Sequence, residues 1–376
     1  MRISRRLDSI PMSGIRKMFD LAGPDSVNLG LGEPDLEPPA AAIEGMRKAV
    51  LDGHNKYGPT AGIMPLREAV AKRYSAYGDV SAGKVMITPS GSSALLEISQ
   101  AFIDPGDEVL VPSPGFVIYS PHAVLAGGKP VEYGFKGKDF QPDVDGMQSL
   151  VTKKTKAVYV NNPSNPTGSV LSEKSWKAIC DLADDNDLII VSDEVYDGFV
   201  YEGRHQSFIP RLDRAIVVGG FSKMMAVTGW RLGFAIAGED FIDPLIKMQY
   251  HVCASPPMPQ MYGVLAAMPG IDAYLEKARA VFRKRRDLIV DRINAIDGMS
   301  VDSPKGAFYA FPSYSADIQS VDLANELARN GLICTPGSAF GSRGEGHLRF
   351  SYAAGEESIG RGMDILSSTM EGLGKP

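Results

Sequence analysis

Short apolar runs alternate with amphipathic segments through the middle of the chain. Six runs rich in valine, isoleucine and alanine predict strands, at residues 84–88, 108–112, 156–161, 188–193, 214–219 and 231–237. Between them, residues 92–103 and 172–183 have the apolar spacing of helices. Continuous apolar strands separated by helices are typical of a mostly parallel sheet that is covered on both faces. The pattern therefore predicts an α/β fold.

The pattern changes near residue 270. A long amphipathic helix is predicted at residues 271–296, followed by Gly298 as a stop signal. Beyond it, residues 305–311, 321–330 and 347–353 predict a strand, a helix and a strand. We therefore expect a large domain over residues 31–270 with a mostly parallel central sheet, and a smaller α+β domain over residues 271–376. An N-terminal arm, residues 1–30, is expected to pack on the small domain.

Composition and charge narrow the classes of partner. The chain has 376 residues, of which 44% are hydrophobic and 22% charged, as in an ordinary globular enzyme, and its net charge is −6. That charge disfavours a nucleic-acid partner, and the basic run at residues 283–286 fits a solvated helix face. Three scattered cysteines show neither a disulfide framework nor metal-ligand spacing, and no apolar run reaches membrane-spanning length. We expect a cytoplasmic protein without a metal or a membrane partner.

One segment, residues 219–233, sets Lys223 eight residues before Arg231 across a glycine-containing turn. A lysine amine can form a Schiff base with an aldehyde, and a guanidinium can clamp a phosphate through two hydrogen bonds. Pyridoxal 5′-phosphate carries both groups. Taken alone, however, two charges on a surface turn after a strand explain the segment better.

A phosphate site needs backbone N–H groups at the start of a helix, where the helix dipole also favours an anion. Gly91 and Ser92 follow a predicted strand and begin a predicted helix. Alone this cluster fits an ordinary helix cap equally well. Together with Ser222 and Arg231 it would form a three-sided cup for a phosphate.

Three further residues could hold the ring of such a cofactor. Asp193 ends an apolar strand and offers an anion that would keep a pyridine nitrogen protonated, which makes the ring an electron sink. Tyr196 and Asn165 could donate hydrogen bonds to the phenolate oxygen from its two sides. The alternatives are a buried core tyrosine for Tyr196 and a turn residue in a Pro/Gly-rich loop for Asn165.

These residues, in this order along the chain, resemble the class I and II aminotransferases, which are fold-type I enzymes dependent on pyridoxal phosphate. The resemblance implies that Lys223 holds the cofactor and is the acid–base catalyst. It also implies that Asn165, Asp193, Tyr196 and Arg231 contact the cofactor.

The same resemblance implies roles for four residues elsewhere in the chain. Arg349 would grip the substrate α-carboxylate, and Gly32 would approach the substrate through its backbone, with Asn165 also at the substrate. Phe116 would stack on the pyridine ring. Tyr57 would reach the cofactor phosphate of a neighbouring subunit. The resemblance thus implies a homodimer with a shared active site.

The implied activity is amino-group transfer between an amino acid and a 2-oxo acid by a ping-pong route, with 2-oxoglutarate as one partner. Gly220 stands where many relatives have a phosphate-binding serine, and Ser92 stands at a position where some relatives have a basic residue. No Lys or Arg lies between Lys247 and Lys277, which leaves His251 and Arg16 as weak candidates for reading a distal carboxylate. The donor is therefore expected to be aspartate, an aromatic amino acid, alanine or a broad range of amino acids, with apolar, aromatic or several donors favoured over dicarboxylates alone.

Two other interpretations remain. A β-elimination lyase or cyclopropane-forming synthase of the same fold would share most of these residues. A cofactor-sensing domain of a transcription regulator would carry a DNA-binding domain ahead of this one. The Gly32 loop begins about thirty residues into the sequence, which disfavours that second interpretation.

Overall fold

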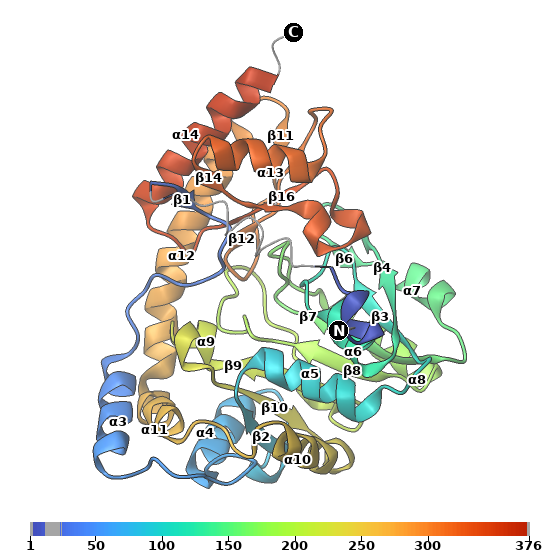
Figure 1. Ribbon diagram of the computed structural model, residues 1–376, viewed down its shortest axis with the longest axis vertical. Coiled ribbons are helices and arrows are strands. Elements are labelled where there is room, and N and C mark those ends of the chain that lie inside the picture. Colours follow the sequence, from blue (N-terminus) through green and yellow to red (C-terminus); the bar gives the residue numbers. More distant parts are fainter. Residues whose placement is uncertain (1–2, 12–22, 24, 374–376) are drawn as a thin grey trace.

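The computed structural model describes residues 3–11, 23 and 25–373, and a seven-stranded sheet lies at its centre (Figure 1). The strands lie in the order β2-β10-β9-β8-β7-β3-β4. Their bounds are β2 Val85–Thr88, β3 Glu108–Pro112, β4 Lys129–Tyr133, β7 Thr155–Asn161, β8 Ile189–Asp193, β9 Ala215–Gly220 and β10 Gly233–Ala237. The predicted α/β fold is confirmed, and each of the six predicted strands ends within two residues of an observed one. The strand β4 was not among the predictions.

One strand departs from the parallel arrangement. β10 is antiparallel to both of its neighbours, β9 and β2. A parallel return needs a crossover of a dozen or more residues, usually with a helix. The chain between β9 and β10 contains only α9, Phe221–Met224, and one short 3₁₀ turn. The chain therefore turns back beside β9 instead of crossing over the sheet.

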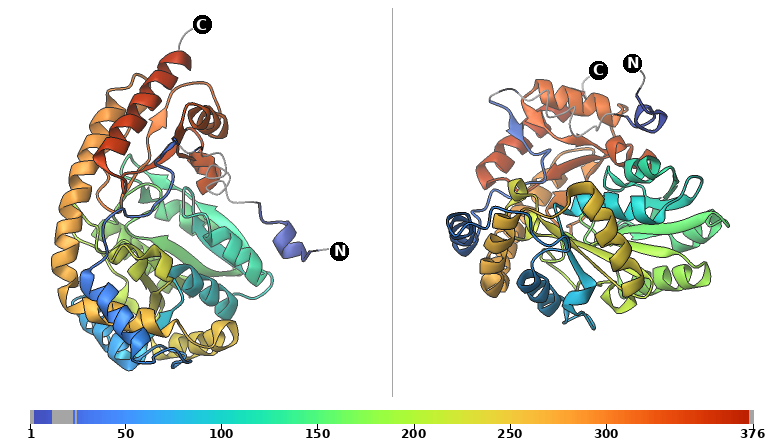
Figure 2. Two further views of the ribbon diagram at one scale, coloured as in Figure 1. Left: turned by 60° about the vertical axis from the view of Figure 1, so that its left-hand side comes forward. Right: turned by 60° about the horizontal axis from the view of Figure 1, so that its bottom comes forward.

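Helices cover both faces of the sheet (Figure 2). Alternate strand residues belong to two hydrophobic clusters, so that Val217 faces one side while Ile216 and Val218 face the other. The second cluster includes α5, α6 and α10, and the first includes α4, α8 and α11. The bounds of these helices and of two others are α3 Ala40–Leu51, α4 Met64–Tyr74, α5 Gly91–Phe102, α6 Tyr119–Ala126, α7 Val144–Leu150, α8 Glu173–Asp185, α10 Glu239–Cys253 and α11 Met258–Ala267.

The last hundred residues form the second part of the structure, drawn in orange and red at the top of Figure 1. The long helix α12, Ile271–Asn294, runs up one side of the molecule and leads into it. A three-stranded sheet has the order β12-β16-β15. The bounds are β11 Met299–Ser300, β12 Tyr309–Ala310, β13 Ser313–Tyr314, α13 Ser320–Arg329, β14 Leu332–Ile333, β15 Thr335–Pro336, β16 Leu348–Ser351 and α14 Glu356–Leu373.

The strand predicted at residues 305–311 is shorter than expected, because only Tyr309 and Ala310 pair with β16. Ala307 has a left-handed backbone with φ of 53°, which interrupts an extended strand. Its N–H donates to the carbonyl of Phe199 instead, and Gly306 bridges Val200. The first half of this segment is therefore hydrogen-bonded to residues 199 and 200, which follow β8, and not to β16.

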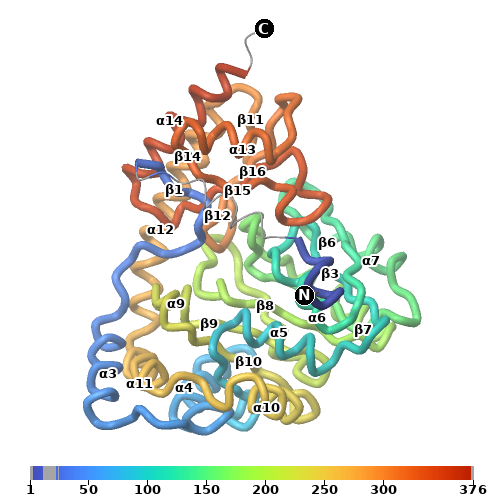
Figure 3. The backbone as a smooth tube through the Cα atoms, in the orientation of Figure 1, coloured from blue at the N-terminus to red at the C-terminus, as the bar shows by residue number. Residues whose placement is uncertain are grey.

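The N-terminal segment contacts both parts of the structure (Figure 3). β1, Val27–Asn28, pairs in parallel with β14. The short helix α1, Arg5–Asp8, lies against α6, where Arg6 donates to the carbonyl of Leu125 at 2.7 Å. The domain boundaries at 30/31 and 270/271 stay predictions. In the described part of the chain, no helix combines the length and the apolar character needed to cross a membrane.

Candidate functional site

The ends of several central strands meet at one edge of the sheet. Gly233, the first residue of β10, pairs with Thr88 at the end of β2 and with Gly220 at the end of β9. On β8, Asp193 pairs with Val218 on one side and with Asn161 on the other. Parallel α/β sheets bind ligands outside the carboxyl ends of their strands. The segments that follow these strands carry most of the residues singled out from the sequence.

The start of α5 and the turn before β10 lie close together at this edge. Ser90 caps α5 by accepting a hydrogen bond from the N–H of Ser93 at 2.9 Å. The backbone N of Gly91 would lie only 2.5 Å from a Cβ built at Gly233, so the two segments can approach only because residue 233 is a glycine. The first N–H groups of a helix have no partner within it. Gly91 and Ser92 are therefore placed to bind an anion.

Ser222 and Arg231 flank the same edge. Ser222 is half-buried within α9. Arg231 has a left-handed backbone with φ of 53°, and its Nη1 donates to the carbonyl of Thr228 at 2.8 Å. Its side chain is exposed. The predicted three-sided cup has its segments joined at one sheet edge, with the Arg231 side chain accessible to a ligand.

Lys223 is half-buried on α9, and its Nζ donates to the carbonyl oxygen of Gly32 at 2.5 Å. Burial lowers the pKa of Lys223 to about 8; Glu33 opposes this shift, and Arg231 and Arg349 add to it. An amine with this pKa has a large neutral fraction near pH 8 and is a competent nucleophile and base. The Lys223 amine therefore loses its proton at a lower pH than the amine of an ordinary lysine, whose pKa is 10.5.

This shift predicts that the cofactor-free protein contains one lysine that loses its proton near pH 8, well below the usual value of 10.5. As pH rises through 8, the ammonium of Lys223 becomes a neutral amine while exposed lysines stay charged. Reductive methylation with ¹³C-formaldehyde and NMR titration would measure it. A Lys223→Arg variant identifies the resonance, and titration of that resonance together with the exposed lysines would contradict the prediction.

Asp193 is buried at the end of β8, and the phenol of Tyr119 donates to its Oδ2 at 2.7 Å. The N–H of Val195 donates to Oδ1 at 3.3 Å. Burial raises the pKa of Asp193 to about 6, although both hydrogen bonds oppose the shift. Phe116 packs edge-on against Tyr119, with ring centroids 5.8 Å apart. This carboxylate has no cationic partner among its hydrogen-bonding groups, so a bound cation would stabilise it.

Asn165 and Arg349 are in direct contact. The Nη1 of Arg349 donates to the Oδ1 of Asn165 at 3.0 Å, and the backbone N–H of Asn165 donates to the side chain of Asn161 at 2.6 Å. Both Asn165 and Arg349 are buried. The structure therefore brings together two predicted residues that are 184 positions apart in the sequence.

Arg349 is held by neutral groups. Its Nη2 donates to the carbonyl of Gly30 and to the hydroxyl of Thr335, and its guanidinium lies over the rings of Tyr309 and Phe340 at 4.7 and 4.9 Å. Burial lowers the pKa of Arg349. Its Nε is buried and has no partner among the described residues. A carboxylate would supply the missing acceptor and the missing charge.

Tyr196 and Gly32 meet at Tyr309. The hydroxyls of Tyr196 and Tyr309 lie 2.8 Å apart, and the rings meet edge to face. A Cβ at Gly32 would lie 1.9 Å from the hydroxyl oxygen of Tyr309, so only glycine fits at this position. The loop of residues 30–32 thus accepts hydrogen bonds from both Lys223 and Arg349.

Two other candidates, Tyr57 and His251, are exposed, and a third, Arg16, is not among the described residues. Tyr57 is 89% exposed and does not pack into the strand-end site of its own chain. His251 is exposed near the end of α10, where its ring contacts Tyr250. Neither of these two exposed residues is brought next to Lys223 by the described structure.

Sequence reasoning did not find Tyr119, Tyr309, Thr335 or Phe340 as site residues. Tyr119 lies three positions after Phe116, but nothing local indicates that its hydroxyl reaches Asp193, 74 positions away. Tyr309 lies in a segment predicted to be an ordinary strand. No local sequence signal marks either hydroxyl as a site group, because both find their partners in distant segments.

The fold and this site define a transferase with a lysine, a buried carboxylate and a buried arginine at the strand ends of an α/β sheet. The family described as "Aminotransferase class I and II" matches residues 24–359. The chain belongs to this family, whose members use pyridoxal phosphate, and its activity is the transfer of an amino group between an amino acid and a 2-oxo acid.

Relatives with different names match nearly the whole chain. A probable aspartate aminotransferase of Methanocaldococcus jannaschii is 39% identical over 98% of this chain and 100% of its own. An aromatic-amino-acid aminotransferase of Thermococcus litoralis is 38% identical over 99% of both chains. The solved aspartate aminotransferase of Thermus thermophilus with maleate has a TM-score of 0.93 at 34% identity, covering 98% of this chain and 100% of its own.

Proposed function

We propose that the strand-end site binds pyridoxal 5′-phosphate at Lys223. The observation that carries this proposal is that Lys223 and Arg349, from the two parts of the structure, both donate to the loop of residues 30–32. That loop connects the Lys223 amine, which we propose as the nucleophile, with the Arg349 guanidinium, which we propose as the carboxylate clamp. The raised pKa of Asp193 and the partnerless Nε of Arg349 fit a ligand that brings a cation to the first and an anion to the second.

In this proposal the phosphate lies against the start of α5, at Gly91 and Ser92, with Ser222 and Arg231 completing its site. Asp193, oriented by Tyr119, would hold the ring nitrogen, and Phe116 would cover the ring. Tyr196 and Asn165 would donate to the phenolate oxygen. Asp193 pairs with Asn161 at the end of the neighbouring strand β7, and Asn161 accepts a hydrogen bond from the N–H of Asn165 in the loop that follows; both contacts support this arrangement.

When bound, the cofactor supplies an aldehyde for the amino group and a ring that accepts electron density. Arg349 holds the substrate α-carboxylate and so orients the bond from the α-carbon to its hydrogen. Lys223 would remove the proton from the substrate α-carbon as a base. It would then act as an acid and donate a proton to the cofactor's former aldehyde carbon, to which the amino group is transferred. Its lowered pKa, about 8, suits both directions near neutral pH.

We propose that the donors include aromatic and apolar amino acids and that 2-oxoglutarate is one acceptor. The absence of Lys and Arg between Lys247 and Lys277 supports this preference. Relatives are named for aspartate as well as for aromatic amino acids and alanine, so aspartate is also a candidate donor. Mixing the loaded enzyme with single amino acids and following the cofactor absorbance would test it. A response to aspartate and glutamate alone would contradict the preference.

The experiment that tests the function follows both products. Loaded enzyme is given an amino acid and 2-oxoglutarate, and we expect glutamate and the matching 2-oxo acid in equal amounts. Release of ammonia and pyruvate from a cysteine-type substrate, without glutamate formation, would instead indicate the β-elimination chemistry that the same fold supports.

We further propose a homodimer in which Tyr57 reaches the partner's phosphate site. Tyr57, Tyr250 and Val252 are 89%, 61% and 52% exposed, an exposure that would favour burial against a second copy. Lys223→Ala and Tyr57→Ala chains, refolded together, would then form hybrids with one intact site. We expect roughly a quarter of the wild-type activity from random pairing. Activity no higher than that of the separate variants would contradict a shared site.

We propose a cytoplasmic location for this enzyme. All three cysteines are free thiols, with Cys180 and Cys334 buried and Cys253 half-buried. Free thiols suit a reducing compartment. Fractionation of cells that express the tagged chain would test this.

A further inference from the structure

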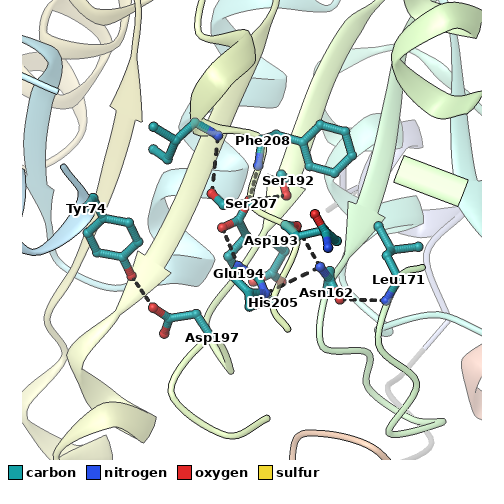
Figure 4. Close-up of polar contacts among 12 residues, drawn as sticks. Tyr74, Asn162, Leu171, Ser192, Asp193, Glu194, Asp197, His205, Ser207 and Phe208 are labelled. Atoms are coloured by element: carbon teal, nitrogen blue, oxygen red, sulfur yellow. Dashed lines mark hydrogen bonds and ion pairs between the residues drawn. The ribbon is translucent and has the colours of Figure 1, made fainter. Parts of the chain in front are cut away.

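A buried polar cluster lies directly behind Asp193 (Figure 4). Glu194, the next residue, is fully buried, and its carboxylate accepts hydrogen bonds from the hydroxyl of Ser192 at 2.8 Å and the N–H of Phe208 at 2.9 Å. The Nε2 of His205 lies 2.8 Å from the other carboxylate oxygen. The proposed cofactor site uses neither Glu194 nor His205. A buried charge requires such partners, but it does not by itself explain why a charge is there.

Asn162 connects this pair to the loop that carries Asn165. Its Nδ2 lies 3.4 Å from the Nδ1 of His205 and donates to the carbonyl of Gln206 at 2.8 Å. Its Oδ1 accepts from the N–H of Leu171 at 3.0 Å, so the side chain ties together both ends of the loop. Its own N–H donates to the carbonyl of Asp193 at 3.0 Å.

The same carbonyl leads on to the site. The Asp193 carbonyl also accepts from the side chain of Asn161 at 2.9 Å, and the Oδ1 of Asn161 accepts from the N–H of Asn165 at 2.6 Å. Asn165 in turn accepts from Arg349. A continuous set of hydrogen bonds thus runs from the 205–206 segment through Asn162 and the Asp193 backbone to the substrate side of the site.

We propose that Glu194, His205 and Asn162 form a positioning unit that fixes Asn165 relative to Asp193, and with them the two polar sides of the cofactor ring. This proposal rests on the proposed function. The unit acts by holding the 161–165 segment against the end of β8, so that the group facing the ring nitrogen and the group facing the phenolate keep one spacing. A site needs such support because small displacements of its contacts reduce binding and rate.

The charge on His205 fits this role. Burial disfavours the charged ring, but Glu194 outweighs burial, with a smaller contribution from Asp197, so that the pKa of His205 is raised from 6.5. Tyr77 faces the ring edge to face at 5.7 Å and adds no charge. The ion pair with Glu194 is therefore present while His205 is protonated, and it weakens as pH rises through the raised pKa of His205. In the protonated ring Nδ1 is a donor and cannot accept from the Nδ2 of Asn162, so the link to Asn162 then runs through the carbonyl of Gln206, the next residue.

The test uses Glu194→Gln and His205→Gln, which keep hydrogen-bonding groups but remove the charges. We expect each variant to bind the cofactor about tenfold more weakly, since groups that orient a site's ligands typically contribute this much. We also expect the pH midpoint of the bound cofactor's visible absorbance to shift. Cofactor affinity is measured on the cofactor-free protein, so the result does not depend on whether transamination occurs.

Tyr74→Phe is the matched control. It removes a part-buried hydrogen bond to Asp197, 2.7 Å long, which lies outside the path to Asn165 (Figure 4). We expect it to lower the melting temperature without changing the cofactor affinity or the absorbance midpoint. If either glutamine variant fails to fold, Asn162→Ser tests the same connection. Variants that lose only thermal stability, as the control does, would overturn the proposal.

Discussion

Replacing Lys223 with alanine is expected to abolish amino transfer, lowering turnover by about 10⁴-fold or more. General acid–base catalysis alone contributes up to roughly 10⁴-fold, and this residue is also proposed to be the nucleophile for the cofactor aldehyde. No other lysine is brought to the Gly32 carbonyl in the described residues, where the Lys223 amine lies. Turnover is measured as glutamate formed from 2-oxoglutarate.

Lys247→Ala is the control, because Lys247 is an exposed lysine on α10. We expect it to keep wild-type turnover. The Lys223→Ala protein should still fold and retain cofactor through the groups at Asp193 and the start of α5, but without the absorbance of the lysine-bound form. Wild-type turnover in Lys223→Ala would refute the role of this lysine.

Most strands of the central sheet were predictable because burial on both faces produces continuous apolar runs, as at residues 188–191. The edge strand β4, Lys129–Tyr133, contains Lys, Pro and Glu and has no such run, so it was missed. The direction of β10 was not predictable from such runs. It depends on the conformation of the twelve residues between β9 and β10. These residues form the short helix α9, which contains Lys223, and a 3₁₀ turn.

In the candidate site, only the residues that lie in short recognisable motifs could be proposed from the sequence. Lys223, Asp193 and Asn165 each lie in a short segment whose residue types fit one chemistry. Tyr119 and Tyr309 lie in ordinary apolar contexts, and their hydroxyls gain partners only when segments 74 and 113 positions apart come together. Contacts between distant segments leave no periodic signal in one sequence, so these residues required coordinates.

The Glu194 and His205 pair is a second example of a contact that one sequence does not reveal. The sequence places Glu194 beside Asp193, where either carboxylate could have faced the ligand. Side chains alternate between the two faces along a strand, but a single sequence does not say which face has the site. The structure resolves this: Tyr119 bonds Asp193, whereas His205 bonds Glu194 behind it.

Replacing Arg349 is expected to have the second-largest effect and to act on substrate binding. Truncation of one member of a buried, hydrogen-bonded charge pair costs about 2–5 kcal/mol, or roughly 30- to 5,000-fold in kcat/KM. Arg349→Ala should show a loss in this range, expressed mainly as a higher KM. Arg349→Lys should recover little of it, because one ammonium cannot reproduce the two-point contact of a guanidinium.

The structural reason is that the hydrogen-bond acceptors around Arg349 fit a planar guanidinium group. Its two terminal nitrogens reach Asn165, Thr335 and the Gly30 carbonyl, while its buried Nε has no hydrogen-bond partner in the described part of the chain. An amine substrate without an α-carboxylate gives the decisive comparison. Its half-reaction should be nearly as fast in Arg349→Ala as in wild type, and Arg343→Ala, an exposed arginine nearby in sequence, should change neither substrate. Equal losses for the amino acid and the amine would show that Arg349 supports the fold of the site instead of binding the carboxylate.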